Sequence, residues 1–223
     1  NSLRALGCRA VELDCGPEVR FQPTLGMLLA WVAEHGAPPR GLVLASPANP
    51  TGTVIDAAEL EAIAQWCEAE GVLLISDEIY QNLVYEGARA VSIVEAVPEL
   101  AGQTILVNGV AKTYAMTGWR VGWMAGPQDV VKAAANLQSH ATSNVANVSQ
   151  QAALAAVSGP LDAVARMKES FDRRRRTMVT GLNAVPGFRC PRPEGAFYAY
   201  VDVHDALGRT VRGRTVASVS YTH

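Results

Sequence analysis

Gly109-Val-Ala-Lys-Thr-Tyr-Ala-Met-Thr-Gly-Trp-Arg-Val-Gly122 places an amine, a hydroxyl and a guanidinium close together in the chain. The stretch follows a short apolar run at 104–108, which is typical of a β-strand. Lys112 lies just after that run, and Arg120 follows eight residues later with Thr117 between them. We therefore predict a strand that leads into a loop carrying reactive and charged side chains.

The pairing of Lys112 with Arg120 favours a ligand that carries both an aldehyde and a phosphate. A lysine amine forms a Schiff base with an aldehyde, and an arginine guanidinium binds a phosphate through two parallel hydrogen bonds. Pyridoxal 5′-phosphate carries both groups. We therefore predict this cofactor, with Lys112 as its attachment point, Arg120 on the phosphate and Thr117 as a further hydroxyl donor.

Short apolar runs alternate with helical patterns along most of the chain, which predicts an α/β fold with a mainly parallel sheet. Buried strands are expected at 41–45, 72–76, 104–108 and 121–125, and the first of them reads as buried on both faces. Helices are expected at 24–35, from Asp56 with Glu59 in a capping box, and at 127–140, 149–156 and 160–185. Beyond this last helix, which is long enough to bridge two domains, a strand is expected at 196–201.

Polar side chains follow three of the predicted strands, where open α/β sheets bind their ligands. Asn49 lies beyond the first strand, Asp77 ends the second and Lys112 follows the third. Alone, Asp77 is more simply a helix cap and Asn49 part of a turn. When the three strand ends are considered together, Asp77 is predicted to keep a pyridine nitrogen protonated. Asn49 and Tyr80 are predicted to hold the phenolic oxygen of the same ring.

Composition excludes several classes of function. The chain has 223 residues, 49% of them hydrophobic, and a formal net charge of −2, which gives no electrostatic reason to expect nucleic acid or an anionic membrane as a partner. No apolar run approaches the ~18 residues of a membrane span. Four scattered cysteines with no metal-ligand spacing predict free thiols, no metal and a cytoplasmic location.

Four motifs together resemble the fold-type I pyridoxal-phosphate-dependent aminotransferases of class I/II, over roughly residues 1 to 202. The motifs are Ser46-Pro-Ala-Asn-Pro-Thr-Gly52, Ser76-Asp-Glu-Ile-Tyr80, Ala111-Lys-Thr-Tyr-Ala-Met-Thr-Gly-Trp-Arg120 and Glu194-Gly-Ala-Phe-Tyr198. The resemblance implies a three-layer large cofactor-binding domain at 1–160. It also implies, at 161–223, an interdomain helix and the start of a smaller α+β domain, and a homodimer with active sites near the subunit interface.

The resemblance also implies an activity. An aspartate-like amino acid would donate its amino group to a 2-oxo acid in a ping-pong cycle, with Lys112 forming the internal aldimine and moving the proton from the substrate. Asp77, Asn49, Tyr80 and Arg120 would take the roles predicted above. Two alternatives stay open: a β-eliminating lyase or synthase on the same fold, and an aminotransferase-like effector domain of a transcriptional regulator.

The sequence departs from the family pattern in several places. Ala111 stands where relatives commonly carry a serine that helps to bind the phosphate. The phosphate loop, the aromatic residue that stacks on the ring and the arginine that binds the substrate carboxylate are expected outside this chain. We therefore expect a fragment truncated at both ends and inactive by itself. The segment Val219-Ser-Tyr-Thr-His223 matches nothing expected and reads as non-native, and a cis bond is expected at Asn49–Pro50.

Overall fold

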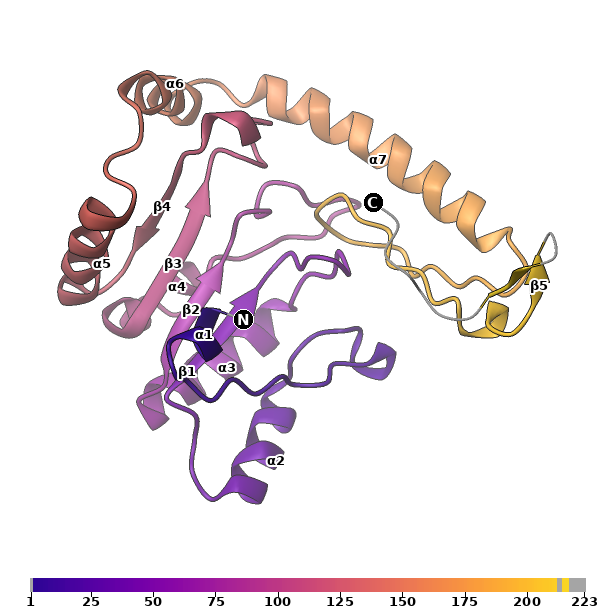
Figure 1. The fold of residues 1–223 in the computed structure, drawn as a ribbon, viewed down its shortest axis with the longest axis horizontal. Coiled ribbons are helices and arrows are strands. Elements are labelled where there is room, and N and C mark those ends of the chain that lie inside the picture. Colours follow the sequence, from indigo (N-terminus) through magenta and orange to yellow (C-terminus); the bar gives the residue numbers. More distant parts are fainter. Residues whose placement is uncertain (1, 212–213, 217–223) are drawn as a thin grey trace.

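The computed structural model describes residues 2–211 and 214–216. Its main sheet has the order β1 (Gly41–Ala45), β2 (Leu73–Asp77), β3 (Thr104–Gly109) and β4 (Gly122–Ala125). The first three strands are parallel and β4 is antiparallel to β3, so the arrowheads of β1, β2 and β3 point the same way (Figure 1). The predicted α/β fold with a mainly parallel sheet is confirmed.

The five predicted helices are present, and two short ones that were not predicted, the first and the fourth, join them. They are α1 (Ser2–Ala5), α2 (Leu25–His35), α3 (Ala57–Glu70), α4 (Ile93–Ala96), α5 (Gln128–Ala141), α6 (Asn147–Ser158) and α7 (Asp162–Asn183). Two short strands, β5 (Thr210–Val211) and β6 (Arg214–Thr215), form a separate antiparallel pair. The segment Val219 to His223, which we expected to be non-native, lies outside the described residues.

The ends of α2 follow from its sequence, but the capping box predicted for α3 is wrong. The Thr24 hydroxyl caps α2, and Gly36 ends it in the left-handed region at φ 80°. Asp56 precedes α3 without a side-chain capping bond, because its carboxylate pairs with Arg20. Glu59 instead accepts a hydrogen bond from the backbone N–H of Leu25, so two expected capping groups join distant segments.

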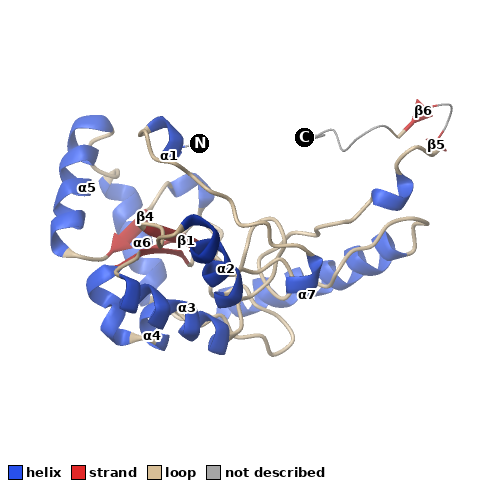
Figure 2. Ribbon diagram, turned by 90° about the horizontal axis from the view of Figure 1, so that it is seen from below, coloured by secondary structure: helices blue, strands red, loops and turns tan. Residues whose placement is uncertain are grey.

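The main core lies on one face of the sheet. In Figure 2 the sheet is seen nearly edge-on, with α3 and α4 on one side and α1 and α5 on the other. The buried residues of this core come from β1, β2 and the helices α2, α3 and α4, and include Leu28, Leu42, Leu44, Ile63, Leu74 and Ile93. The expectation that β1 is buried on both faces is wrong, because Leu42 and Leu44 face the core while Val43 is 55% exposed.

The strand predicted at 196–201 is also wrong. Only isolated bridges form nearby, Val84 with Gly195 and Arg189 with Asp202. Ala196 has φ 56°, in the left-handed region, which interrupts an extended chain. The apolar residues around it pack against α7 and the segment after β2. They are apolar because they are buried in this contact, and not because they form a strand.

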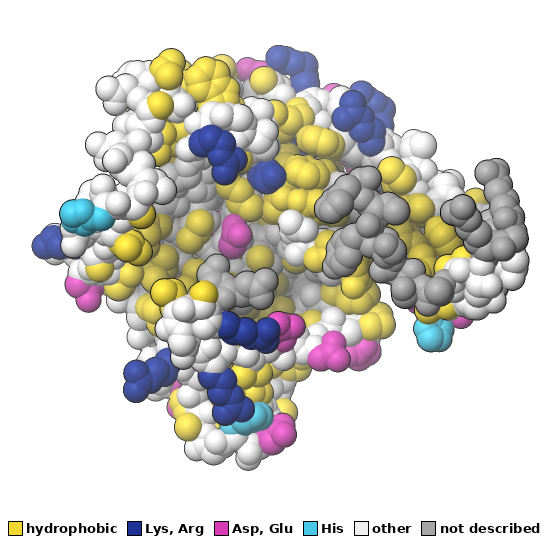
Figure 3. Space-filling view, in the orientation of Figure 1, with side chains coloured by type: hydrophobic (Ala, Val, Ile, Leu, Met, Phe, Trp, Pro, Cys, Tyr) yellow, Lys and Arg dark blue, Asp and Glu magenta, His cyan; other side chains and the backbone are white. Residues whose placement is uncertain are grey.

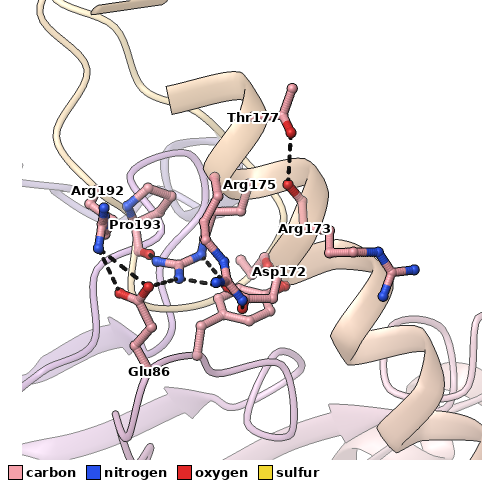
Figure 4. Close-up of polar contacts among 10 residues, drawn as sticks. Glu86, Asp172, Arg173, Arg175, Thr177, Arg192 and Pro193 are labelled. Atoms are coloured by element: carbon pink, nitrogen blue, oxygen red, sulfur yellow. Dashed lines mark hydrogen bonds and ion pairs between the residues drawn. The ribbon is translucent and has the colours of Figure 1, made fainter. Parts of the chain in front are cut away.

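A buried arginine holds α7 against the rest of the molecule. The side chain of Arg175 is 6% exposed, and its guanidinium pairs with Asp172 at 2.6 Å and with Glu86 at 2.9 Å. It also donates to the Pro193 carbonyl at 2.8 Å, and Glu86 accepts from Arg192 at 3.1 Å. Figure 4 shows these groups converging from α7, the segment after β2 and the segment around Pro193. Arg175 thus joins three parts of the chain that are distant in sequence.

This network lowers the pKa of both carboxyl groups, Glu86 and Asp172. Hydrogen bonds from Arg175 lower the pKa of Glu86, with Arg192 adding to the effect. Burial acts to raise the pKa of Asp172, but hydrogen bonds from Arg175 and Arg176 outweigh it and the net pKa is lowered. Both carboxylates are therefore held in their charged form.

We expect Arg175→Met to lower the free energy of unfolding by on the order of 3 kcal/mol, because it removes the buried member of the network. The Pro193 carbonyl then loses its donor, and the two carboxylates keep only exposed arginines as partners. Arg176→Met is the matched control. Arg176 pairs with the same Asp172, but its side chain is 57% exposed, so a loss of about 1 kcal/mol or less is expected. Urea unfolding of both variants measures the difference, and equal losses would contradict the role given to Arg175.

The stability of the chain should also fall in acid. Because Glu86 and Asp172 have lowered pKa values in the folded state, their contribution is complete above the ordinary values of 4.5 and 3.8 and is lost as the pH falls through the folded-state values. In Arg175→Met both pKa values return toward ordinary, so stability should fall less steeply between about pH 5 and pH 3. Urea midpoints across this range check the slope, and parallel curves would count against this explanation.

Candidate active site

Asp77 lies at the carboxyl end of β2 with part of its carboxylate available. Its Oδ1 accepts a hydrogen bond from the backbone N–H of Ile79 at 3.1 Å. Among the described residues no ion pair or further side-chain hydrogen bond involves this carboxylate, and the side chain is half-buried. The register places Asp77 beside Ala45 and Val107, so it lies at the common edge of the parallel strands. A carboxylate in this position can accept a hydrogen bond from a ligand.

Tyr80 and Lys112 come together beside this edge. The ammonium nitrogen of Lys112 lies 5.8 Å from the centre of the Tyr80 ring and 5.5 Å from the centre of the Phe197 ring, within the range of cation–π attraction. Tyr80 is buried, which raises its pKa, and the hydrogen bond with Tyr198 and the charge of Asp77 raise it further. Tyr80 therefore remains a neutral hydroxyl that can donate to a ligand.

Asn49 lies on the loop between β1 and α3, which carries cis bonds at Ser46–Pro47 and Asn49–Pro50 as expected for the latter. The loop is held at its start by the Ser46 N–H, which donates to the Asp77 carbonyl at 3.2 Å. The Asn49 side chain is exposed, and among the described residues it makes no hydrogen bond to Asp77 or Lys112. The structure thus brings the loop to the site without joining Asn49 to the other candidates.

The end of the same loop is fixed by close packing. The Gly52 carbonyl accepts from the N–H groups of Glu194 and Gly195, both at 2.8 Å. Gly52 has φ 69°, and a Cβ at this position would lie 2.4 Å from the Cβ of Pro193. A side chain here would therefore separate the loop carrying Asn49 from the segment 193–195.

Arg120 and Thr117 lie on the loop that follows Lys112. The Ala115 N–H donates to the Lys112 carbonyl at 3.2 Å, and a 3₁₀ turn at Thr117–Trp119 brings the chain back toward β4. The exposed guanidinium of Arg120 donates to the carbonyl of Thr117 at 3.0 Å. Among the described residues no contact joins Arg120 to Lys112, so the two are close in the chain without touching.

Four residues near the site were not singled out from the sequence. Phe197 and Tyr198 pack on Tyr80 with ring centres 5.4 Å and 5.8 Å away, and the Asn82 amide donates to the Thr113 hydroxyl at 3.4 Å. The motif Glu194-Gly-Ala-Phe-Tyr198 contained the signal for the two aromatic residues. Nothing in the spacing of Asn82 and Thr113 indicated their contact.

These groups fit the predicted cofactor by their chemistry. A carboxylate with a free oxygen, an amine beside two aromatic rings, a buried phenol and an exposed guanidinium are the groups that an aromatic aldehyde with a ring nitrogen and a phosphate requires. The space-filling view shows a hollow beyond the ends of the central strands, with an acidic side chain inside it and basic side chains at its rim (Figure 3). The described residues include no group of three or more His, Cys, Asp or Glu able to hold a metal ion.

Within the described part of the chain, none of the helices combines the length and apolar character needed to cross a membrane.

Comparison with known proteins assigns this arrangement to a family. A family model described as aminotransferase class I and II matches residues 1–217. The aspartate aminotransferase of Streptomyces avermitilis is 60% identical over 213 residues, which cover 96% of this chain and 52% of that protein. The valine–pyruvate aminotransferase of Mycobacterium tuberculosis is 45% identical over 206 residues, covering 92% and 51%.

Solved structures agree with the sequence comparison. The crystal structure of the aspartate aminotransferase of Rhizobium meliloti superposes with a TM-score of 0.85 and 36% identity, covering 97% of this chain and 54% of that one. The chain spans about half the length of the curated relatives that it matches. With the family model extending over nearly all of its residues, the chain belongs to the class I and II aminotransferases.

Proposed function

We propose that the protein transfers an amino group from an aspartate-like amino acid to a 2-oxo acid, with pyridoxal 5′-phosphate as its cofactor. The observation that carries this proposal is the position of Lys112, whose amine lies within cation–π range of the neighbouring rings of Tyr80 and Phe197. Asp77 faces the same edge of the sheet. The 60% identical aspartate aminotransferase supports the choice of donor, and the transaminase names of the relatives favour amino transfer over elimination.

When bound, pyridoxal 5′-phosphate supplies an electron sink for the negative charge that develops at the substrate α-carbon. In our proposal Asp77 accepts a hydrogen bond from the ring nitrogen through the carboxylate oxygen that Ile79 leaves free. Tyr80 and Asn49 donate to the phenolic oxygen. The rings of Tyr80 and Phe197 lie beside the Lys112 amine. Lys112 would remove a proton from the substrate α-carbon and deliver it to C4′, the aldehyde carbon of the cofactor.

The phosphate is assigned to the loop after β3. Arg120 would exchange its hydrogen bond with the Thr117 carbonyl for a bidentate contact with the phosphate, and the exposed Thr117 hydroxyl would add a donor. Ala111 offers no hydroxyl at the neighbouring position. In this proposal the loop after β1 binds the phenolic oxygen, the end of β2 binds the ring nitrogen and the loop after β3 binds the phosphate.

We also propose that the protein works as a homodimer in the cytoplasm, with amino acids and 2-oxo acids as its small-molecule partners. The family resemblance supports the dimer. The four cysteines, Cys8, Cys15, Cys67 and Cys190, are free thiols, which supports a reducing compartment. We place the boundary between the large domain and the interdomain helix near residue 160, just before α7 begins.

The attachment of the cofactor can be tested directly, because the chain contains three lysines, at positions 112, 132 and 168. The purified chain is incubated with pyridoxal 5′-phosphate and reduced with borohydride, and its peptides are analysed by mass spectrometry. We expect the label on Lys112 at cofactor concentrations that leave Lys132 unmodified. Lys112 lies beside Tyr80, which is assigned to the cofactor ring, whereas Lys132 lies on α5. Lys112→Ala should abolish the specific label, whereas Lys132→Ala should retain it. Labelling spread equally over the three lysines would contradict the proposal.

The role of Asp77 gives a second prediction. Asp77→Asn keeps the shape of the side chain and removes its charge, so binding of pyridoxal 5′-phosphate should weaken roughly ten- to a hundredfold, as expected for losing one hydrogen bond between charged groups. Asp56→Asn is the control, because Asp56 is an exposed carboxylate of the same kind beyond the end of β1. Equilibrium dialysis measures both, and equal affinity of Asp77→Asn and the unsubstituted chain would rule out this role.

A further inference from the structure

Two phenol groups meet at the candidate active site. The hydroxyl oxygens of Tyr80 and Tyr198 lie 2.5 Å apart, although the residues are 118 positions apart in the chain. Each hydroxyl carries one proton, so within the pair one group donates and the other accepts. The direction of this hydrogen bond decides whether the Tyr80 proton is used inside the pair or is free for a ligand.

The surroundings of Tyr80 favour one direction when an anionic oxygen is bound. The groups facing Tyr80 are Asp77, the Lys112 ammonium and Tyr198. Neither Asp77 nor Lys112 forms a hydrogen bond with the Tyr80 hydroxyl, so Tyr198 is its partner among the described residues. A negatively charged acceptor attracts the Tyr80 proton more strongly than the neutral Tyr198 oxygen does. The Tyr80 oxygen is then left to accept from Tyr198.

We propose that Tyr198 is a positioning residue that donates its hydroxyl proton to Tyr80 and thereby leaves the Tyr80 proton for the phenolic oxygen of the cofactor. This inference rests on the proposed function, since it requires a cofactor oxygen beside Tyr80. Hydrogen bonds in a chain strengthen one another, so Tyr198 would make Tyr80 a stronger donor without touching the cofactor.

The backbone around Tyr198 is held in place independently of this contact. The Tyr85 N–H donates to the Glu194 carbonyl at 2.9 Å, and the Ala196 N–H donates to the Leu83 carbonyl at 2.8 Å. The Tyr85 hydroxyl donates to the Ala196 carbonyl as well. The two backbone bonds fix the segment before Tyr198 without the Tyr85 hydroxyl, so the Tyr198 hydroxyl meets Tyr80 at little cost in conformational entropy.

The aromatic packing fixes the orientation of both rings. Tyr198 meets Tyr80 edge to face at 78°, and Phe197 also meets Tyr80 edge to face, at 81°. Phe197 in turn stacks on Phe171 of α7, with ring centres 5.4 Å apart. A Phe at position 198 would keep the edge-to-face ring contact and remove only the hydroxyl, so the hydrogen bond can be tested apart from the packing.

The test compares Tyr198→Phe with Tyr85→Phe, which removes a hydroxyl that binds the backbone of the same segment and has no contact with the Tyr80 hydroxyl. The readout is the pH midpoint at which the absorbance of the bound pyridoxal 5′-phosphate changes. A donor to the phenolic oxygen favours the deprotonated cofactor and lowers this midpoint. We therefore expect Tyr198→Phe to raise it by about 0.3–1 unit, as for weakening one hydrogen bond, and Tyr85→Phe to leave it unchanged.

A double-substitution cycle keeps the inference testable if either variant is less stable. Because Tyr198 acts through Tyr80, Tyr80→Phe combined with Tyr198→Phe should have the same midpoint as Tyr80→Phe alone. Additive shifts would overturn the inference, as would an unchanged midpoint in Tyr198→Phe or equal shifts in Tyr198→Phe and Tyr85→Phe. If the unsubstituted chain shows no absorbance change that depends on Lys112, the proposed function fails and this inference fails with it.

Discussion

The parallel pairing of β1, β2 and β3 fixes where each candidate residue can lie. The register aligns Ala45, the last residue of β1, with Asp77, the last residue of β2, and Asp77 with Val107, two residues before β3 ends. The loops that follow them therefore leave the sheet side by side and carry their functional groups into the same region. A shift of one residue in β2 would turn Asp77 to the opposite face, toward the core formed with α3.

A second constraint comes from the segment around Gly195. It bonds to Gly52 on the loop after β1 and pairs with Val84 on the segment after β2. Arg175 anchors the neighbouring Pro193 to α7. The loops that follow β1 and β2 are thus held by a segment and a helix that come after the whole sheet in the sequence.

The sequence predicted the elements whose signal is local. Short apolar runs identified all four strands of the main sheet, and the helical pattern at 24–35 located α2. It failed where a contact between distant segments decided the outcome. Asp56 pairs with Arg20 instead of capping α3, Val43 is left exposed, and the run after Gly195 bends at Ala196 instead of forming a ladder. The same reason explains the site: Lys112 and Asp77 are visible as strand ends, whereas the contact of Tyr198 with Tyr80 depends on packing between segments 118 residues apart.

The length of α7 gives the molecule a mechanical property. Its 22 residues form a rod of about 33 Å. Arg175 fixes one point of the rod to the segment after β2. Phe171, one turn away, stacks on the Phe197 ring, whose centre lies 5.5 Å from the Lys112 amine. A small tilt of the rod about that fixed point would displace its far end by several times the movement at Phe171. Forces acting on the distant end of the helix would therefore reach the neighbourhood of Lys112 as small, reduced movements of a single aromatic ring.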